Sequence, residues 1–445
     1  MPNPLLLTAL ARSILAGDTE IEQVVSRLTL TLGRRWRWLR PLARRYTESF
    51  AGKARPRRRD VEAFLHSDFG FTRAVKKYRN EILVKTPLVE AHPMQPVAAA
   101  KAWEVPAIES VEDLAEWLHL SEPELAWFAD LKGLESKPGR RGICPQLTHY
   151  YYRILAKKSG SLRLIEEPKP HLKQIQRRIL SDILDRIPIH PAAHGFVKGR
   201  SIQTFATQHV GRYLVLRMDL QDFFPSFAAR RVQAFFRTAG YPESVADLLG
   251  ALCTNVAPRS LWKDIEPGTD GSLVRHVQSL YSRPHLPQGA PTSPALANLC
   301  AYRIDCRLHG LAQATGATYT RYADDLVFSG NDSFAKGVER FSTHVAAILL
   351  QEGFSVHHRK TRIMRQGVRQ YLVGLVANQR VNVVRADFDR LKATLHNCVR
   401  YGPQSQNREA HVCFGSHLEG MVGFVETINP EKGKRLRGFL ERIQW

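Results

Sequence analysis

The sequence predicts an α+β fold built from several lobes. At 445 residues the chain is roughly three times the usual length of a single domain. Short runs of β-forming residues alternate with segments that have helical periodicity, which is typical of mixed folds. Hydrophobic residues make up 44% of the chain and charged residues 24%, and this composition excludes a wholly disordered protein. We expect three parts, at residues 1–107, 108–385 and 386–445.

The first part, residues 1–107, is predicted to be a basic, helical extension followed by a linker. Apolar and basic positions alternate with helical spacing up to about residue 52. The compact basic run at 53–59 is either a solvated surface or a contact for RNA. Residues 86–107 are rich in proline and alanine, which is typical of a linker.

The middle part begins with helices and then turns to short strands, whereas the last part is helical and basic. The predicted elements are helices that begin at Ser110, at Ser121 and near residue 172, hairpin strands at 150–155 and 162–165, and helices at 385–399 and 431–443. Strands separated by helices in this way support the α+β prediction.

The net charge predicts a polyanionic partner. Lysine and arginine total 64 against 42 acidic residues, which gives a formal charge of +22 and a pI of about 10.0. Nucleic acid is the leading candidate, and a merely soluble basic protein is the alternative. The six cysteines lie far apart without zinc-binding spacing, so we expect buried thiols. Without a membrane-spanning run or a secretory signal pattern, we expect a cytoplasmic protein with no membrane partner.

Three aspartates are the candidate catalytic residues. Asp219 ends an apolar, β-rich run, and we expect its side chain to face solvent or a cleft instead of the core. Asp324 and Asp325 lie between two strand-like arms, as in the turn of a hairpin. Adjacent carboxylates repel unless positive charge lies between them, and Mg²⁺ prefers such hard oxygen ligands. The pattern suggests two Mg²⁺ ions, with Mn²⁺ as an alternative, and in-line phosphoryl transfer. Two exposed aspartates in an ordinary turn are the other interpretation.

A loop punctuated by proline and glycine lies between these acidic segments. The turn at Gln288 and Gly289 would allow the backbone to approach a ligand closely. Pro294 is predicted to open a helix whose apolar face includes Leu296, Ile304 and Leu308.

Taken together, these segments resemble the bacterial reverse transcriptases, and most closely the retron type. The resemblance rests on eight segments that follow the family's order over roughly residues 108–430. They are the fingers segments at 160–168, 172–176 and 194–202, the first acidic motif at 217–226, the loop at 286–299, the Tyr-Ala-Asp-Asp turn at 322–325, the segment at 353–361 and the primer grip at 370–374. It implies a right-hand polymerase fold, with fingers and palm in residues 108–385, a thumb in 386–445, and RNA-templated DNA synthesis.

The resemblance also implies roles for individual residues. Asp219, Asp324 and Asp325 would hold two Mg²⁺ ions, and Leu220 would add a backbone carbonyl. The residues implied in nucleotide binding are Arg163 and the Asp222 backbone at the triphosphate, Phe224 as the steric gate under the sugar, Gln288 and Gly289 in the nucleotide and template pocket, and Lys360 at the departing pyrophosphate. Alternatively, Phe224 is a core aromatic and Lys360 an ordinary exposed lysine.

The resemblance implies an enzyme that copies part of a structured noncoding RNA into single-stranded DNA. Family members would take dNTPs, prime from a 2′-hydroxyl of that RNA, and act in phage defence with a toxin or effector protein. Two short segments keep only part of the residues typical of retron enzymes. Residues 205–209 lack the usual asparagine of Asn-Ala-x-x-His, and residues 372–374 lack the usual threonine of Val-Thr-Gly. A defence-associated or abortive-infection reverse transcriptase, with protein-primed or untemplated synthesis, is therefore the second hypothesis. A non-catalytic RNA-binding scaffold is the third.

Overall fold

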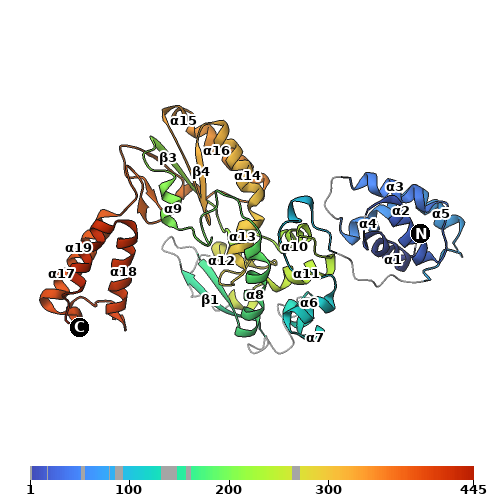
Figure 1. Ribbon diagram of the computed structural model, residues 1–445, viewed down its shortest axis with the longest axis horizontal. Helices are drawn as coiled ribbons and strands as arrows, with labels where there is room; N and C mark the ends of the chain where they lie inside the picture. The colour runs from blue at the N-terminus through green and yellow to red at the C-terminus, as the bar shows by residue number, and fades with distance from the viewer. Residues whose placement is uncertain are drawn as a thin grey trace. The chain divides into compact units, whose positions relative to one another are not determined.

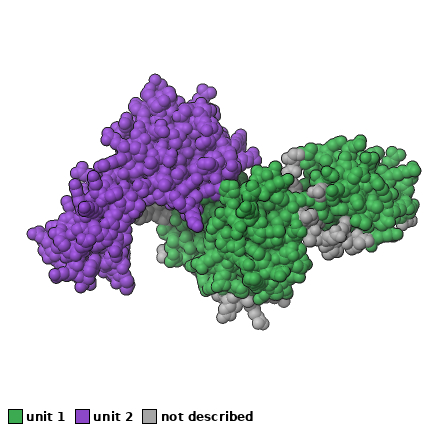
Figure 2. Space-filling view, viewed as in Figure 1, with its two compact units in different colours: residues 1–188, 224–300 green, residues 189–223, 301–445 purple. Residues whose placement is uncertain are grey.

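The structure of the protein is a computed structural model. It describes residues 3–17, 19–51, 56–79, 81–85, 94–131, 148–156, 162–262 and 271–445. The chain divides into two compact units, which Figure 2 colours separately: Met1–Pro188 with Phe224–Cys300, and Ile189–Phe223 with Ala301–Trp445.

The first five helices of unit 1 gather into one bundle around an apolar core of their own (Figure 1). They are α1 (Pro4–Leu15), α2 (Ile21–Leu32), α3 (Leu39–Ser49), α4 (Arg58–Ser67) and α5 (Phe69–Lys77). Buried apolar residues recur at helical spacing, as with Leu10 and Ile14 on α1 and Val24 and Leu28 on α2. This periodicity explains why the segment forms helices that pack together.

In the rest of unit 1, the described residues form a hairpin, α-helices and a few short 3-10 helices. The predicted hairpin is confirmed, because β1 (Tyr150–Ala156) pairs antiparallel with β2 (Leu162–Pro168). Ser110 and Ser121 cap helices as predicted. The helices are α6 (Val111–Leu118), α7 (Glu122–Ala129), α8 (Pro170–Asp182), α10 (Ala229–Thr238), α11 (Glu243–Leu252), α12 (Gly271–Tyr281) and α13 (Ser293–Cys300).

The described part of the segment interpreted as a linker is bound to its own unit. The Gln95 amide donates to the Gly240 carbonyl at 2.9 Å, and the Val97 amide donates to the Thr238 carbonyl at 3.3 Å. Residues 94–107 are therefore a docked strap along the end of α10, whereas residues 86–93 lie outside the described residues.

Unit 2 is built on an antiparallel sheet with strand order β4-β5-β3-β6. Its strands are β3 (Leu214–Asp219), β4 (Thr318–Tyr322), β5 (Asp325–Gly330) and β6 (Arg362–Arg365). A smaller sheet contains β7 (Tyr371–Leu372), β8 (Leu375–Val376) and β9 (Asn382–Val383). The helices are α9 (Ile202–Thr207), α14 (Tyr302–Ala314), α15 (Asp332–Lys336), α16 (Val338–Gln351), α17 (Arg385–Tyr401), α18 (Phe414–Ile428) and α19 (Pro430–Leu440).

Several sequence-based expectations are refined by these elements. The two C-terminal helices are confirmed as α17 and α19, but α18 was not predicted. The helix expected from Pro294 is interrupted at Ala301, so its apolar positions are shared between α13 and α14. Cys253 and Cys398 are buried as expected, whereas the same expectation is wrong for two exposed thiols, Cys306 and Cys413. Across the described ranges, every helix is too short or too polar to cross a membrane.

Candidate active site

The structure brings the three candidate aspartates together at one end of the unit 2 sheet. Asp219 is the last residue of β3 and Asp325 the first of β5, and the two are direct partners in the antiparallel register. Asp324 lies in the turn between β4 and β5, and its carbonyl accepts a hydrogen bond from the Leu220 amide at 2.9 Å. Of the two surroundings expected for Asp219, solvent or a cleft, free exposure to solvent is excluded, because only 3% of the residue is exposed.

Two cationic side chains form ion pairs with these carboxylates. Lys360 Nζ lies 3.0 Å from both carboxylate oxygens of Asp219, and Arg217 Nε lies 2.7 Å from Oδ1 of Asp325. Burial raises the pKa of Asp324 to about 6, and the charges of Asp325 and Asp219 contribute to that rise. Burial also raises the pKa of Asp325, against the opposing effect of Arg217. Three carboxylates thus lie beside two cationic side chains, which leaves one surplus negative charge when all three are ionised.

The chemistry of this donor set fits a divalent cation. As the side chains lie, the described residues contain no group of three His, Cys, Asp or Glu that could hold a metal ion. Two of the three candidate carboxylates, those of Asp219 and Asp325, are instead engaged by Lys360 and Arg217. Three carboxylates are nevertheless hard oxygen ligands of the kind that Mg²⁺ prefers. A cation would therefore be held by Asp219, Asp324 and Asp325.

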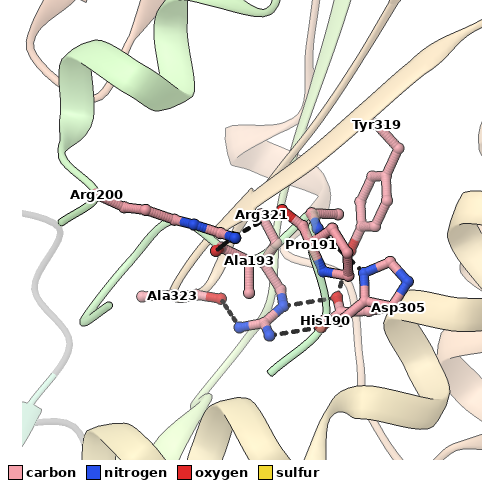
Figure 3. Close-up of polar contacts among 9 residues, drawn as sticks. His190, Pro191, Ala193, Arg200, Asp305, Tyr319, Arg321 and Ala323 are labelled. Atoms are coloured by element: carbon pink, nitrogen blue, oxygen red, sulfur yellow. Dashed lines mark hydrogen bonds and ion pairs between the residues drawn. The ribbon is translucent and has the colours of Figure 1, made fainter. Parts of the chain in front are cut away.

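A buried ion pair is hydrogen-bonded to Ala323, the residue before Asp324 (Figure 3). Arg321, on β4, donates to both carboxylate oxygens of Asp305 on α14, at 2.8 and 2.7 Å. Tyr319 donates its hydroxyl to the same carboxylate at 2.8 Å. Arg321 also donates to the Ala323 carbonyl at 3.3 Å. Ala323 has φ +53°, a conformation that costs a non-glycine residue free energy, so the guanidinium holds the turn in a strained shape.

The turn is also held from one side by the segment around Gly195. The His194 amide donates to the Arg321 carbonyl at 2.7 Å, which joins this segment to β4. A Cβ at Gly195 would lie 2.6 Å from the Ala323 amide nitrogen, so only glycine fits. The Arg200 guanidinium in turn fixes the segment by donating to two of its carbonyls, those of Pro191 and Ala193 (Figure 3).

His209, in the turn after α9, is a structural residue bound to the same sheet. Its two ring nitrogens lie 2.7 Å from the hydroxyls of Ser329 on β5 and Thr320 on β4. Burial lowers the pKa of His209 to about 3, so the ring is neutral and bridges the two strands. In the retron-like segment at 205–209, the histidine therefore has a structural role through packing and hydrogen bonding.

In unit 1, the loop with Gln288 and Gly289 lies against the strand that carries Arg163. The Glu166 amide of β2 donates to the Gln288 carbonyl at 2.9 Å. Gly289 has φ +138°, and a Cβ there would lie 2.7 Å from the Glu166 carbonyl oxygen. The close approach that the sequence assigned to a ligand is thus made, at least in part, to the protein's own strand. Arg163 is exposed on this strand.

The side chain of Glu166 fixes the same loop from inside the unit. Its carboxylate accepts from Asn255 Nδ2 at 2.8 Å and lies 2.8 Å from His285 Nε2. Both members of the Glu166–His285 pair are almost fully buried. Burial alone would lower the pKa of His285, but the Glu166 carboxylate outweighs it and raises that pKa. Glu166 lies in the fingers segment at 160–168, but its pairing with His285, 119 residues away, was not predicted.

The other candidates are divided between the units. Leu220 is buried in unit 2 and forms a bridge with Val356, whereas Asp222 adopts φ +48° in the same unit. Phe224 begins a short 3-10 helix in unit 1 and is half-buried, a burial compatible with either of its two interpretations. The structure therefore groups the carboxylates with Leu220 and Lys360, and groups Arg163 with the Gln288 loop.

Comparison with known proteins identifies the family. Residues 155–383 match the family described as reverse transcriptase (RNA-dependent DNA polymerase). The chain is 41% identical over 295 residues to the retron Mx65 reverse transcriptase of Myxococcus xanthus, covering 65% of this chain and 64% of that protein. It is 37% identical over 358 residues to the Mx162 enzyme of the same organism, covering 77% and 68%, and 30% identical over 300 residues to the Escherichia coli Ec86 enzyme, covering 66% and 82%.

The matched region includes all of the candidate aspartates, the Gln288 loop and Arg163. The chain spans a little under two thirds of the Mx65 enzyme. The family implies the right-hand polymerase fold, which agrees with the mixed helices and sheets described above. The chain therefore belongs to the reverse transcriptases, the family of RNA-dependent DNA polymerases, and within that family to the retron type.

Proposed function

We propose that this chain copies a structured noncoding RNA into single-stranded DNA by adding nucleotides at the Asp219, Asp324 and Asp325 site. The observation that carries the proposal is the register pairing of Asp219 with Asp325, beside Asp324, at one end of the sheet. A site with this surplus of negative charge requires cations before a triphosphate can approach. Family membership supplies the reaction class.

The proposed roles at the site follow from charge and geometry. Bound divalent cations would supply the positive charge that activates the attacking hydroxyl and stabilises the leaving oxygen. Asp219, Asp324 and Asp325, with the Leu220 carbonyl, would hold two Mg²⁺ ions. Lys360 neutralises Asp219 as the side chains lie. Its half-exposed ammonium would move to the departing pyrophosphate once the carboxylate has another partner.

Further residues are proposed to bind the nucleotide. Arg163 would grip the triphosphate, because a planar guanidinium matches phosphate geometry. The remaining proposed roles are those of the Asp222 backbone at the phosphates, Phe224 as the gate beneath the sugar, and Gln288 and Gly289 in the nucleotide and template pocket. In this proposal, residues 108–385 form fingers and palm and residues 386–445 the thumb.

The proposed biology is that of a retron. The relatives at 30–41% identity are named retron reverse transcriptases, which supports a structured RNA as template. Priming from a 2′-hydroxyl would leave a branched RNA–DNA product. A role in phage defence, with a toxin or effector protein as partner, completes the proposal.

The test uses protein expressed with its native flanking DNA. Nucleic acid bound to the wild-type protein is extracted, treated separately with RNase and DNase, and compared with that from Asp324→Ala/Asp325→Ala. A matched control, Asp332→Ala/Glu339→Ala, removes the same charge from exposed helices of unit 2. We expect a discrete RNA-linked DNA that disappears only in the first variant. Heterogeneous DNA without a 2′,5′ branch would favour the abortive-infection type, and RNA alone in every sample would favour a scaffold.

A further inference from the structure

The N-terminal helical bundle carries an outward basic face whose charges have no acidic partner within the described protein. On α5, the inward positions Phe71 and Ala74 are buried. The opposite face presents Arg73, Lys76 and Lys77, all exposed. Among the described residues, none of these three cations has a carboxylate within salt-bridge distance, and α5 itself contains no acidic residue. The charges of Arg73 and Lys76 are therefore open to solvent, and the Lys77 ammonium, also exposed, lies over the Tyr78 ring, 5.0 Å from its centroid.

Several other basic residues of the bundle are paired with carboxylates. Arg35 and Arg40 both lie within 3.0 Å of Glu22, and Arg34 lies 3.5 Å from Glu81. The carboxylate of Asp68, which caps α5, is buried and engaged by Arg45 at 2.6 Å. Most of the basic residues on α3 and in the segment that precedes it thus form ion pairs with carboxylates, whereas those on α5 do not.

An exposed aromatic ring lies on the same face of α5. Phe69 is 77% exposed, and it precedes Arg73 by four residues and Lys76 by seven, which places all three on one side of a helix. Favourable interaction with the helix C-terminus would explain Lys76 and Lys77 alone. It explains neither Arg73, which lies a turn earlier, nor an open phenylalanine, because exposure of that ring gains nothing for folding.

We propose that this face of α5 binds RNA, with the three cations on backbone phosphates and Phe69 stacked on an unpaired base. Interleaved cations and an aromatic ring are what single-stranded nucleic acid requires, since phosphates need positive charge and every base offers a flat surface. An acidic protein would not need the ring, and a lipid surface would need a wider apolar face. That the bound RNA is the template of DNA synthesis rests on the proposed function. The surface would anchor that RNA through a part of the chain outside the matched reverse transcriptase residues.

The test measures RNA binding by the full-length protein. The variants are Arg73→Ala/Lys76→Ala/Lys77→Ala and Phe69→Ala, and the probe is an RNA hairpin with an unpaired loop. A charge control, Arg34→Ala/Arg35→Ala/Arg40→Ala, removes three cations that already have acidic partners in the same bundle. Leu30→Ala, at a 61% exposed position of α2, controls for removal of an exposed apolar side chain.

We expect the α5 triple variant to reduce the slope of log affinity against log salt by about 0.7 to 0.9 for each phosphate that the protein no longer neutralises. Phe69→Ala should weaken binding about five- to hundredfold, and more for the loop than for a fully paired hairpin. Nucleotide incorporation on a saturating primed template should be unchanged in both variants. If the wild type incorporates no nucleotide, the proposed function fails while the binding comparison remains decisive.

Two results would overturn the proposal. One is an RNA affinity and a salt dependence that stay at the wild-type values in both α5 variants. An equal loss of RNA affinity in the control variants would count in the same way. The other is unchanged RNA binding combined with abolished binding to anionic vesicles, which would assign the face to a lipid surface.

Discussion

A methyl group at Gly195 should impair catalysis by displacing the acidic turn. The Cβ of Gly195→Ala would lie 2.6 Å from the Ala323 amide nitrogen and 3.2 Å from the Tyr322 carbonyl carbon. Ordinary van der Waals contact begins at 3.4 Å, so the backbone must separate by about 0.8 Å. Both contacts are backbone atoms, which cannot rotate away as a flexible side chain would.

That displacement acts on the residue next to Asp324. Misplacement of reacting groups by about 1 Å can slow a reaction about a hundredfold, which corresponds to about 2.7 kcal/mol of activation free energy. We therefore expect kcat for dNTP incorporation on a primed RNA template to fall by about 10- to 100-fold, with a smaller change in KM for the primed template. Overpacking should lower the free energy of unfolding by about 1–3 kcal/mol.

Gly199→Ala provides the matched control in the same segment. Gly199 has φ +76°, so alanine is strained there, but its Cβ would meet no heavy atom within 4 Å. It should lower stability by about 1 kcal/mol and leave kcat unchanged. Wild-type kcat in Gly195→Ala would refute the proposed displacement of the turn, as would an equal fall in kcat in Gly199→Ala.

Three further predictions concern the buried charges and the metal site. Asp305→Asn leaves the buried Arg321 without its carboxylate and should lower the free energy of unfolding by about 3–5 kcal/mol in chemical denaturation, whereas a decrease under about 1 kcal/mol would contradict a buried pair. The His285 pKa is raised in the folded state, so its contribution to stability is complete below the ordinary value of 6.5 and is lost as pH rises through the raised value. The melting temperature of His285→Gln should therefore approach that of the wild type as the solution becomes alkaline, and a gap that widens with pH would refute this sign. Mg²⁺ at about 100 times its dissociation constant should stabilise the wild type by about 2.7 kcal/mol, an effect that Asp324→Asn should largely remove and that chelation should reverse, while an equal shift in both proteins would place the ion elsewhere.

The features that could be predicted from the sequence are those with local signals. A capping serine and its acidic partner lie three residues apart, as at Ser110 and Asp113. The hairpin of β1 and β2 is marked by two β-rich runs around a polar turn. Asp219 and the Asp324–Asp325 pair were recognisable because an acid at the end of an apolar strand is itself a short pattern.

The supporting residues were not predicted because their partners are distant in sequence. Glu166 and His285 are separated by 119 residues, and His209 lies 111 and 120 residues from its two hydroxyl partners. No periodicity reports such a pairing, since tertiary packing alone decides it. One signal was available: Arg321 lies in the interior of a strand with buried neighbours, and a buried charge requires a buried partner.

A close glycine contact and a buried charged pair occur together at both the acidic turn and the Gln288 loop. This recurrence suggests a reason for burying charges in the chain. In one unit Gly195 contacts a turn held by Arg321 and Asp305, and in the other Gly289 contacts the strand of Glu166. Apolar residues of similar volume could supply comparable stability, because the desolvation of a buried ion pair offsets much of its attraction. Dispersion contacts, however, do not fix the direction of a backbone carbonyl, whereas a hydrogen-bonded guanidinium or carboxylate does. Loops that must present carboxylates or a backbone to a nucleotide within a fraction of an ångström require that directional control, and a glycine allows the supporting segment to come close enough to exert it.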